Sequence, residues 1–272
     1  MAIFVSGPLE RLTDSGFSDF EMDLINAPKE GSEPGGLRLV PEQRDAQKFP
    51  ALQKQFVNFM FFRVSPEWRK LDAETKMAFK KEFEEVYKGF GDLLLFSYSL
   101  VGFDSKADLM LWRIGNSLDL IQEMTAKLYR TNVGSFLETA DNYLSITKKA
   151  MFVTDSIEDR FHVNAGEKKY HFLYPCAKHK EGQGPAGEER DALVEENFMV
   201  GRKFQNIKIH LTHVFGFTDQ EYIISFETDE PKDFLALAEE LRETPSSKLS
   251  LRGMPVYTCR QRPLMECLDA IG

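Results

Sequence analysis

Hydrophobic and polar residues follow two kinds of pattern along this chain, and the patterns recur in the same order in each half. Short alternating or continuous apolar runs predict β-strands, whereas apolar residues three and four positions apart predict amphipathic helices. The resulting order is β-α-β-β-α-β over 56–153 and again over 169–260. Strands are predicted at 56–65, 93–103, 107–114, 142–153, 169–178, 207–217, 221–228 and 255–260, and helices at 72–90, 117–130, from about 188 onward, and at 231–243.

This repeated order predicts an α+β fold made of two tandem ferredoxin-like repeats. In such a repeat, helices cover one face of an antiparallel sheet and leave the other face free. Two such sheets in one chain are expected to bury their free faces against each other in a barrel-like core. The predicted organisation is an N-terminal extended arm at 1–52, a first repeat at 53–153, a linker at 154–168, a second repeat at 169–262 and a C-terminal tail at 263–272.

The net charge, the apolar runs and the cysteine spacing indicate which kinds of partner and which cellular compartment to expect. The formal net charge of −9 argues against a broad basic face for nucleic acid or anionic lipid. No apolar run approaches the roughly 20 residues of a membrane span, and the N-terminal residues lack a secretory pattern, so we expect a cytoplasmic protein. Cys176, Cys259 and Cys267 have no CxxC spacing, which favours reduced thiols over a zinc site or a redox pair.

Several segments resemble one known family, the chlorite dismutase and coproheme decarboxylase proteins. The resemblance covers about residues 53–262 and is carried by FVNFMFFRVSPEWRKL, YSLVGF, ADLMLWRIGNSLDLIQEM, NYLSITK, VGRKF, FGFTDQEYIISFETDEPKDF and LRETPSSKLSLRGMPVYTC. It implies a dimeric α+β barrel and assembly into a homo-oligomer, usually a pentameric ring. It also implies haem b or coproporphyrin iron, held between the sheet and the helices of the second repeat. The family chemistry is haem-dependent oxidoreduction, namely chlorite decomposition or peroxide-driven decarboxylation of coproheme.

The chain departs from the family pattern where the iron ligand is expected. In relatives, a histidine four residues before a glycine ligates the iron, and the matching position before Gly201 is Asn197. A carboxamide is a poor iron ligand compared with a neutral imidazole. Pro245 stands near the place of a supporting glutamate, and the loop at 181–187 lacks aromatic residues. Two hypotheses follow: a haem enzyme with an altered ligand, or a non-haem, non-catalytic member that acts as a structural or ligand-binding oligomer, with a haem-binding paralogue as a possible partner.

The resemblance and the strand pattern together name further candidate residues. The family's distal residue corresponds to His210, as an acid-base group or a replacement ligand, with a hydrogen-bonded strand histidine as the alternative. Alternation puts 209, 211 and 213 on one face and 208, 210 and 212 on the other. The apolar face should meet helices, so His210 and Thr212 are expected to face the pocket. Tyr143 lies on the strand that supplies an oxidising tyrosine in relatives, and Lys148 or Lys149 is expected to hold propionates.

The remaining histidines and both tryptophans have simpler expected roles. His213 is expected to be a half-buried, hydrogen-bonded residue. His162, His171 and His179 lie in or beside linkers and a strand start, without metal-ligand spacing, so we expect them at the surface. Trp68 and Trp112 are expected in the core or at a subunit contact.

Overall fold

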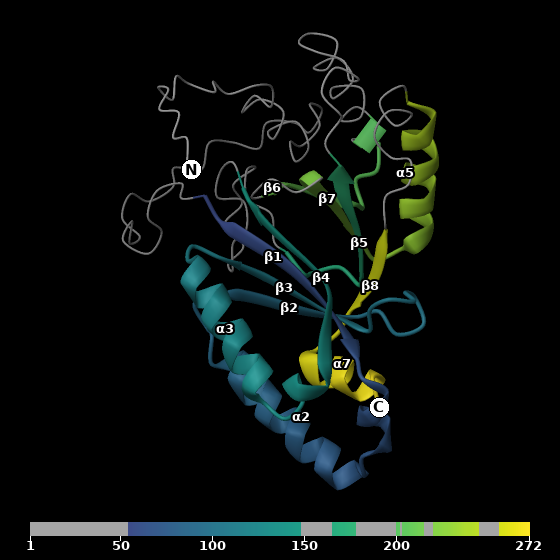
Figure 1. Cartoon of the computed structure of the whole chain (residues 1–272). Coiled ribbons are helices and arrows are strands. Elements are labelled where there is room, and N and C mark those ends of the chain that lie inside the picture. The colour runs from purple at the N-terminus through teal and green to yellow at the C-terminus, as the bar shows by residue number, and fades with distance from the viewer. Residues whose placement is uncertain (1–53, 148–164, 178–199, 202, 215–219, 245–255) are drawn as a thin grey trace, which may run out of the picture.

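The computed structural model describes residues 54–147, 165–177, 200–201, 203–214, 220–244 and 256–272, and these form one closed antiparallel barrel (Figure 1). The strand order around the barrel is β1-β3-β2-β8-β5-β7-β6-β4. The strands are β1 (Phe56–Val64), β2 (Leu94–Ser99), β3 (Leu109–Gly115), β4 (Leu137–Ile146), β5 (Tyr170–Ala177), β6 (Lys208–Val214), β7 (Gln220–Thr228) and β8 (Tyr257–Gln261).

Each half of the chain contributes four neighbouring strands to the barrel. The first half contributes β4-β1-β3-β2 and the second contributes β6-β7-β5-β8, and the halves join through the β2–β8 and β4–β6 pairs. The predicted barrel of two facing sheets is therefore confirmed. Strand β4 begins at Leu137, five residues before its predicted start, and residues 148–153 lie outside the described part. The helix predicted from about 188 is described only at its end, where Val200 and Gly201 are helical.

Among the described residues, three helices of 13 or more residues pack on the outside of the barrel, and two of them begin where the sequence provides a capping residue. Helix α2 (Ala73–Lys88) begins after Asp72, whose carboxylate accepts a hydrogen bond from the Thr75 N–H at 2.9 Å. Helix α3 (Leu118–Arg130) begins after Ser117, which caps it in the same way. Both helices pack on the outer face of the first-half sheet, while α5 (Pro231–Glu243) covers the outer face of the second half (Figure 1).

The C-terminal residues, which the sequence analysis left as a tail, form the short helix α7 (Leu264–Ala270). Its apolar side joins the core under α2 and α3, and Leu268 is 0% exposed. Trp68 Nε1 donates a hydrogen bond to the Gly272 carbonyl at 2.8 Å, and Lys80 pairs with Asp269 at 3.0 Å. A helix of two turns gives too short a periodic pattern to predict, but here it closes one side of the first-half core.

The interior of the barrel is filled mainly by aromatic rings. Phe59 stacks on Trp112 and Phe61 stacks on Tyr257, with ring centroids 5.4 Å and 4.0 Å apart. Trp68 and Trp112 are both fully buried, so their predicted place in the core is confirmed. All three cysteines are buried free thiols. Within the described ranges, no helix is long and apolar enough to cross a membrane.

Candidate functional site

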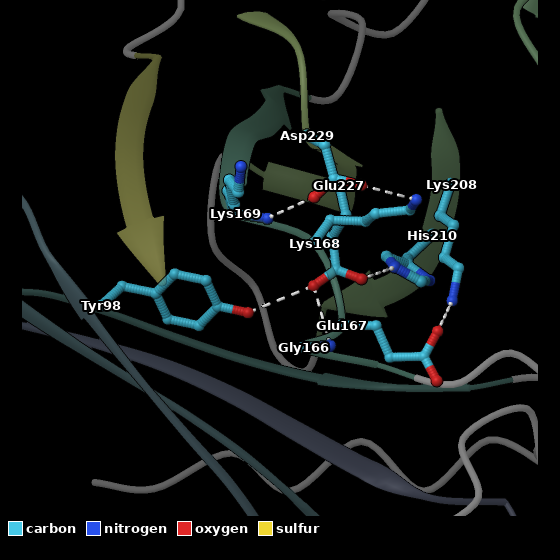
Figure 2. A network of polar contacts seen from close by, with 9 residues as sticks. All are labelled: Tyr98, Gly166, Glu167, Lys168, Lys169, Lys208, His210, Glu227 and Asp229. Carbon is cyan, nitrogen blue, oxygen red and sulfur yellow. Dashed lines mark hydrogen bonds and ion pairs between the residues drawn. The ribbon is translucent and has the colours of Figure 1, made fainter. Parts of the chain in front are cut away.

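A buried acid-base network lies inside the barrel, where the second half of the sheet faces the first (Figure 2). The Glu227 carboxylate accepts a hydrogen bond from the Tyr98 hydroxyl at 3.2 Å and another from the Gly166 N–H at 2.9 Å. Its second oxygen lies 3.3 Å from His210 Nε2. Tyr98, His210 and Glu227 are each at most 1% exposed. Because Tyr98 comes from β2 and the other two side chains from β6 and β7, the network links the two halves.

Strand alternation and register explain why these side chains meet. Pairing sets His210 opposite Ser225 and Lys208 opposite Glu227, so all four side chains belong to the inner face of β6 and β7. Diagonal neighbours on one face of an antiparallel pair lie within reach of long side chains. Glu227 therefore reaches diagonally to His210.

The environment of Glu227 keeps its carboxyl ionised. Burial alone would raise the pKa of Glu227, but the hydrogen bond and electrostatic interaction with His210, together with His171 and the Gly166 N–H, hold that pKa below its ordinary value. Burial also raises the pKa of Tyr98, and the nearby Glu227 charge adds to this effect. Tyr98 is consequently a protonated donor to an anionic acceptor, which is a strong type of hydrogen bond.

His171 completes this interior group from β5. Its ring is 0% exposed and lies 4.7 Å from the Trp112 ring and 6.3 Å from the His210 ring, measured between centroids. Neither of its ring nitrogens has a hydrogen-bond partner among the described residues. Burial lowers the pKa of His171 to about 3, so its imidazole is neutral at neutral pH. The expected surface position of His171 was therefore wrong, because the strand carries this residue on its inner face.

Ion pairs surround the network at its partly exposed margin (Figure 2). Lys168 Nζ lies 2.8 Å from the Asp229 carboxylate, which also accepts a hydrogen bond from the Lys169 N–H. Lys208 Nζ lies 2.5 Å from Glu167. The hydrogen bond from Lys168 is the main reason why the pKa of Asp229 lies below its ordinary value. These pairs hold the segment before β5 against β6 and β7.

Tyr143 and Thr212 also lie inside the barrel. The Tyr143 hydroxyl is 3.3 Å from the Tyr257 hydroxyl, which donates a hydrogen bond to Asp141. Burial raises the pKa of Tyr143. Thr212 Oγ1 accepts a hydrogen bond from Ser145 Oγ at 2.8 Å, which joins β6 to β4. The structure thus brings His210, Thr212 and Tyr143 to one enclosed interior, although it shows no direct contact among the three.

The outer face of the second-half sheet is apolar and meets α5. Phe172 of β5 stacks on Phe234 of α5, with ring centroids 3.8 Å apart and planes inclined by 9°. Ile209 packs against the same cluster, and alternation places Leu211 and His213 on this face as well. The predicted division of β6 is therefore correct, but His210 lies on the face opposite α5 and not in the layer between sheet and helix.

Five residues of the candidate site differ in how the sequence and the structure treat them. Three were predicted from the sequence and two were not. Asn197, Lys148 and Lys149 lie outside the described residues. Glu227 and Tyr98 were not predicted, although an inward-facing glutamate could have been found from the alternation of Ile223, Ser225 and Glu227. Across the described ranges, no three His, Cys, Asp or Glu side chains are arranged to hold a metal ion.

Comparison with known proteins agrees with this architecture. The family model described as chlorite dismutase matches residues 50–262, which is most of the chain. The chain belongs to the chlorite dismutase family. It is similar to the coproheme decarboxylase of Mycolicibacterium smegmatis, with 22% identity over 207 residues that cover 75% of this chain and 88% of the relative.

Two solved structures share the fold of this chain. A mutant chlorite dismutase from Candidatus Nitrospira defluvii superposes with a TM-score of 0.69 at 24% identity, covering 79% of this chain and 94% of that one. A heme-binding protein from Thermus thermophilus gives a TM-score of 0.66 at 20% identity, covering 81% and 96%. The predicted family and α+β barrel are confirmed, and the replacement of the ligand histidine by Asn197 stays a prediction.

Proposed function

We propose that this protein is a haem-dependent oxidoreductase of the chlorite dismutase family, which holds its porphyrin against the outer face of the second of two ferredoxin-like repeats. The observation that carries the proposal is the contrast between the two faces of that sheet. The inner face bears a buried polar network, whereas the outer face bears a cluster of apolar and aromatic side chains that packs against α5. In support, the relatives named above include a coproheme decarboxylase and a heme-binding protein.

The residues of the barrel interior do not fit a porphyrin. Trp112, Tyr98 and Glu227 are all at most 1% exposed, and the rings around them are in mutual contact. A planar macrocycle would have to displace these side chains and leave the ionised Glu227 without its partners. Leaving a buried carboxylate without its hydrogen-bond donors costs at least about 1–3 kcal/mol.

The outer face does fit a flat apolar ring. Tyr174, Ile209 and Leu211 add aromatic and aliphatic side chains to this face; Tyr174 and Ile209 pack against the cluster that contains Phe172 and Phe234, and Leu211 is buried. Binding sites for such ligands are lined mostly by apolar and aromatic side chains, with a few polar groups that fix orientation. Lys148 and Lys149 are the proposed partners of the propionates.

When bound, haem iron supplies the redox centre for chlorite or for peroxide-driven oxidation of coproheme. The side chains of this chain would exclude water from the ring and orient it. His210, Thr212 and Tyr143 lie on the inner face of the barrel. In this proposal they do not touch the ring, and they fix the positions of β6 and β4 from the face opposite to it. The network around Glu227 keeps the proton of Tyr98 in place and holds the sheet rigid.

A second function is favoured by two observations. Asn197 stands where relatives are expected to have the iron ligand, and the Phe172–Phe234 stack already fills part of the layer between sheet and helix. A non-haem member, acting as a structural or ligand-binding oligomer, accounts for both. The predicted pentameric assembly and a haem-binding paralogue as partner belong to either function.

Titration of the purified protein with haem b and with coproporphyrin III iron separates the two functions. The proposed enzyme gives a saturable, shifted Soret band, whereas a spectrum like that of free haem supports the non-haem function. Asn197→His is expected to raise haem affinity, because it restores an imidazole at the family position. No gain in that variant would mean that the layer between sheet and helix does not admit the ring.

A further inference from the structure

Two tyrosines meet across the interior of the barrel and form a second polar group there. Tyr143 belongs to β4 and Tyr257 to β8, and these strands are not neighbours in the barrel order, so the two rings approach each other through the interior. Their hydroxyl oxygens lie 3.3 Å apart. The Tyr257 hydroxyl also donates a hydrogen bond to the carboxylate of Asp141, which precedes Tyr143 by two positions on β4 and therefore shares its face.

The number of hydrogens in this group fixes the direction of its hydrogen bonds. A phenol hydroxyl carries one hydrogen and donates one bond. Because Tyr257 donates its hydrogen to Asp141, its oxygen accepts the hydrogen of Tyr143 in the 3.3 Å contact. The series therefore runs from Tyr143 through Tyr257 to Asp141 and ends at a carboxylate. Burial raises the pKa of both tyrosines, so both hydroxyls are protonated at rest.

The surroundings of Tyr257 shield its ring from water but leave its acceptor in contact with solvent. The side chain of Tyr257 is 2% exposed, and the fully buried Phe61 stacks on it with ring centroids 4.0 Å apart and planes inclined by 29°. Phe61 also meets the Tyr143 ring edge-on. Asp141 is only partly buried, so its carboxylate exchanges protons with water. A reactive state of the phenol ring is thus protected, while a proton that leaves the phenol has a place to go.

A phenol bonded to a carboxylate in this way is arranged for one-electron oxidation. A phenol that has lost an electron is a strong acid, so its oxidation is easy only where a positioned base takes the proton in the same step. A one-electron oxidant removes one electron from Tyr257, the O–H bond breaks, and the proton moves along the hydrogen bond to Asp141. The products are a neutral phenoxyl radical and a carboxyl group, and the oxidant is reduced by one electron.

A second tyrosine–carboxylate pair in the barrel is less suited to this step. Tyr98 donates a hydrogen bond to Glu227, but the same carboxylate accepts another from the Gly166 N–H and lies beside His210. These partners hold the pKa of Glu227 below its ordinary value, which makes this carboxylate a weaker base. Glu227 is also 0% exposed, whereas the acceptor of Tyr257 reaches solvent.

We propose that Tyr257 is a redox-active tyrosine, with Asp141 as its proton acceptor and Tyr143 as the hydrogen-bond donor to the oxidised ring. The site takes a one-electron oxidant of high potential, such as an oxidised metal complex, and stores one oxidising equivalent inside the barrel. The inference goes beyond the proposed function and does not depend on it, because the oxidant does not have to be haem.

Photo-oxidation of the purified protein without added haem tests the assignment. A photoexcited ruthenium(II) polypyridyl complex with a sacrificial electron acceptor supplies the oxidant, and electron paramagnetic resonance of frozen samples detects the persistent radical. The wild type is expected to form a persistent tyrosyl radical, and Tyr257→Phe to lose it. Asp141→Asn keeps an oxygen acceptor of the same size but no base. It is expected to form the radical about a hundredfold more slowly, at a rate that rises with the concentration of buffer base.

Two further variants show which phenol carries the radical. Tyr143→Phe is expected to keep the radical but to shift its g value in high-field spectra, because the oxidised ring then lacks its hydrogen-bond donor. Tyr129→Phe is the matched control. Tyr129 is an exposed tyrosine whose hydroxyl pairs with that of Thr139 and not with a carboxylate, so this variant should behave as wild type.

The contrary results are equally specific. Absence of a persistent tyrosyl radical in the wild type, its survival in Tyr257→Phe, or its loss in Tyr98→Phe would overturn the assignment. Equal rates in the wild type and Asp141→Asn would do the same, because Asp141 would not be taking the proton. Circular dichroism identifies a variant that has not folded, and if Tyr257→Phe is one, the isosteric Asp141→Asn decides. Haem titration tests the proposed function separately, so either can fail without the other.

Discussion

Replacing His171 with phenylalanine is expected to make the protein less sensitive to acid. The imidazole is 0% exposed, and its pKa falls from an ordinary 6.5 to about 3 in the folded protein. Between these two values the unfolded chain binds a proton that the folded chain does not bind. Folding stability therefore falls as the pH drops below 6.5, and the loss continues until the pH reaches about 3.

The size of this effect follows from the two pKa values. At pH 5 the unfolded imidazole is protonated and the folded one is neutral, so the wild type loses about 2 kcal/mol of stability from this group between pH 7 and pH 5. The phenylalanine variant has no titrating group at this position. It also removes two buried ring nitrogens that have no partner among the described residues, which favours the variant by about 1–3 kcal/mol at every pH.

Urea denaturation at pH 7, 6 and 5 measures the effect, with the fluorescence of Trp68 and Trp112 as the signal. The stability difference between variant and wild type should grow by about 2 kcal/mol from pH 7 to pH 5. Tyr98→Phe is the matched control, since it changes the same cluster without removing a group that titrates in this range. Equal pH dependence of the wild type and the His171 variant would refute the argument, because it would mean that His171 already binds its proton in the folded state.

Three further predictions concern buried contacts and use the same denaturation assay. Glu227→Gln should destabilise the protein by about 1–3 kcal/mol at pH 7 because it removes the anion that His210 faces, and wild-type stability would contradict the network. Asn58→Ala should lower the free energy of unfolding by about 3 kcal/mol, since Asn58 Oδ1 accepts hydrogen bonds from the buried Arg113. Adding Arg113→Met should recover much of this stability, because no buried charge is then left without its partner. Simply additive effects of the two substitutions would contradict this prediction. Leu268→Ala should cost about 2–5 kcal/mol, and a cost below about 1 kcal/mol would mean that α7 is not part of the core.

Much of the fold could be predicted because the strands and long helices carry complete periodic patterns. The run Leu109–Gly115 is buried at every position, and α3 shows an apolar stripe that ends at Leu128. The helix α7 has too few turns for such a pattern, and the early start of β4 is hidden because exposed polar residues such as Glu138 and Thr139 occupy its first positions. Periodicity detects burial on one side, so elements that are short or polar at their ends escape it.

The candidate site was harder to predict than the fold. Alternation divided β6 correctly, but it could not say which face would meet a ligand, and His210 lies inside the barrel. His171 looked like a surface residue because it stands near a linker, whereas its position on β5 and the closure of the barrel bury it. Glu227 can be recognised as part of the site only from the register of β6 and β7, which places it diagonally across from His210. Long-range pairing, which no local pattern encodes, decides each of these cases.

The most direct test of the account is a crystal structure of the protein reconstituted with haem. We predict density for the ring on the outer face of the second-half sheet, against Ile209 and Leu211, with Tyr98, Glu227 and His210 unchanged inside the barrel. A ring bound elsewhere, or crystals grown with excess haem that contain none, would contradict the account.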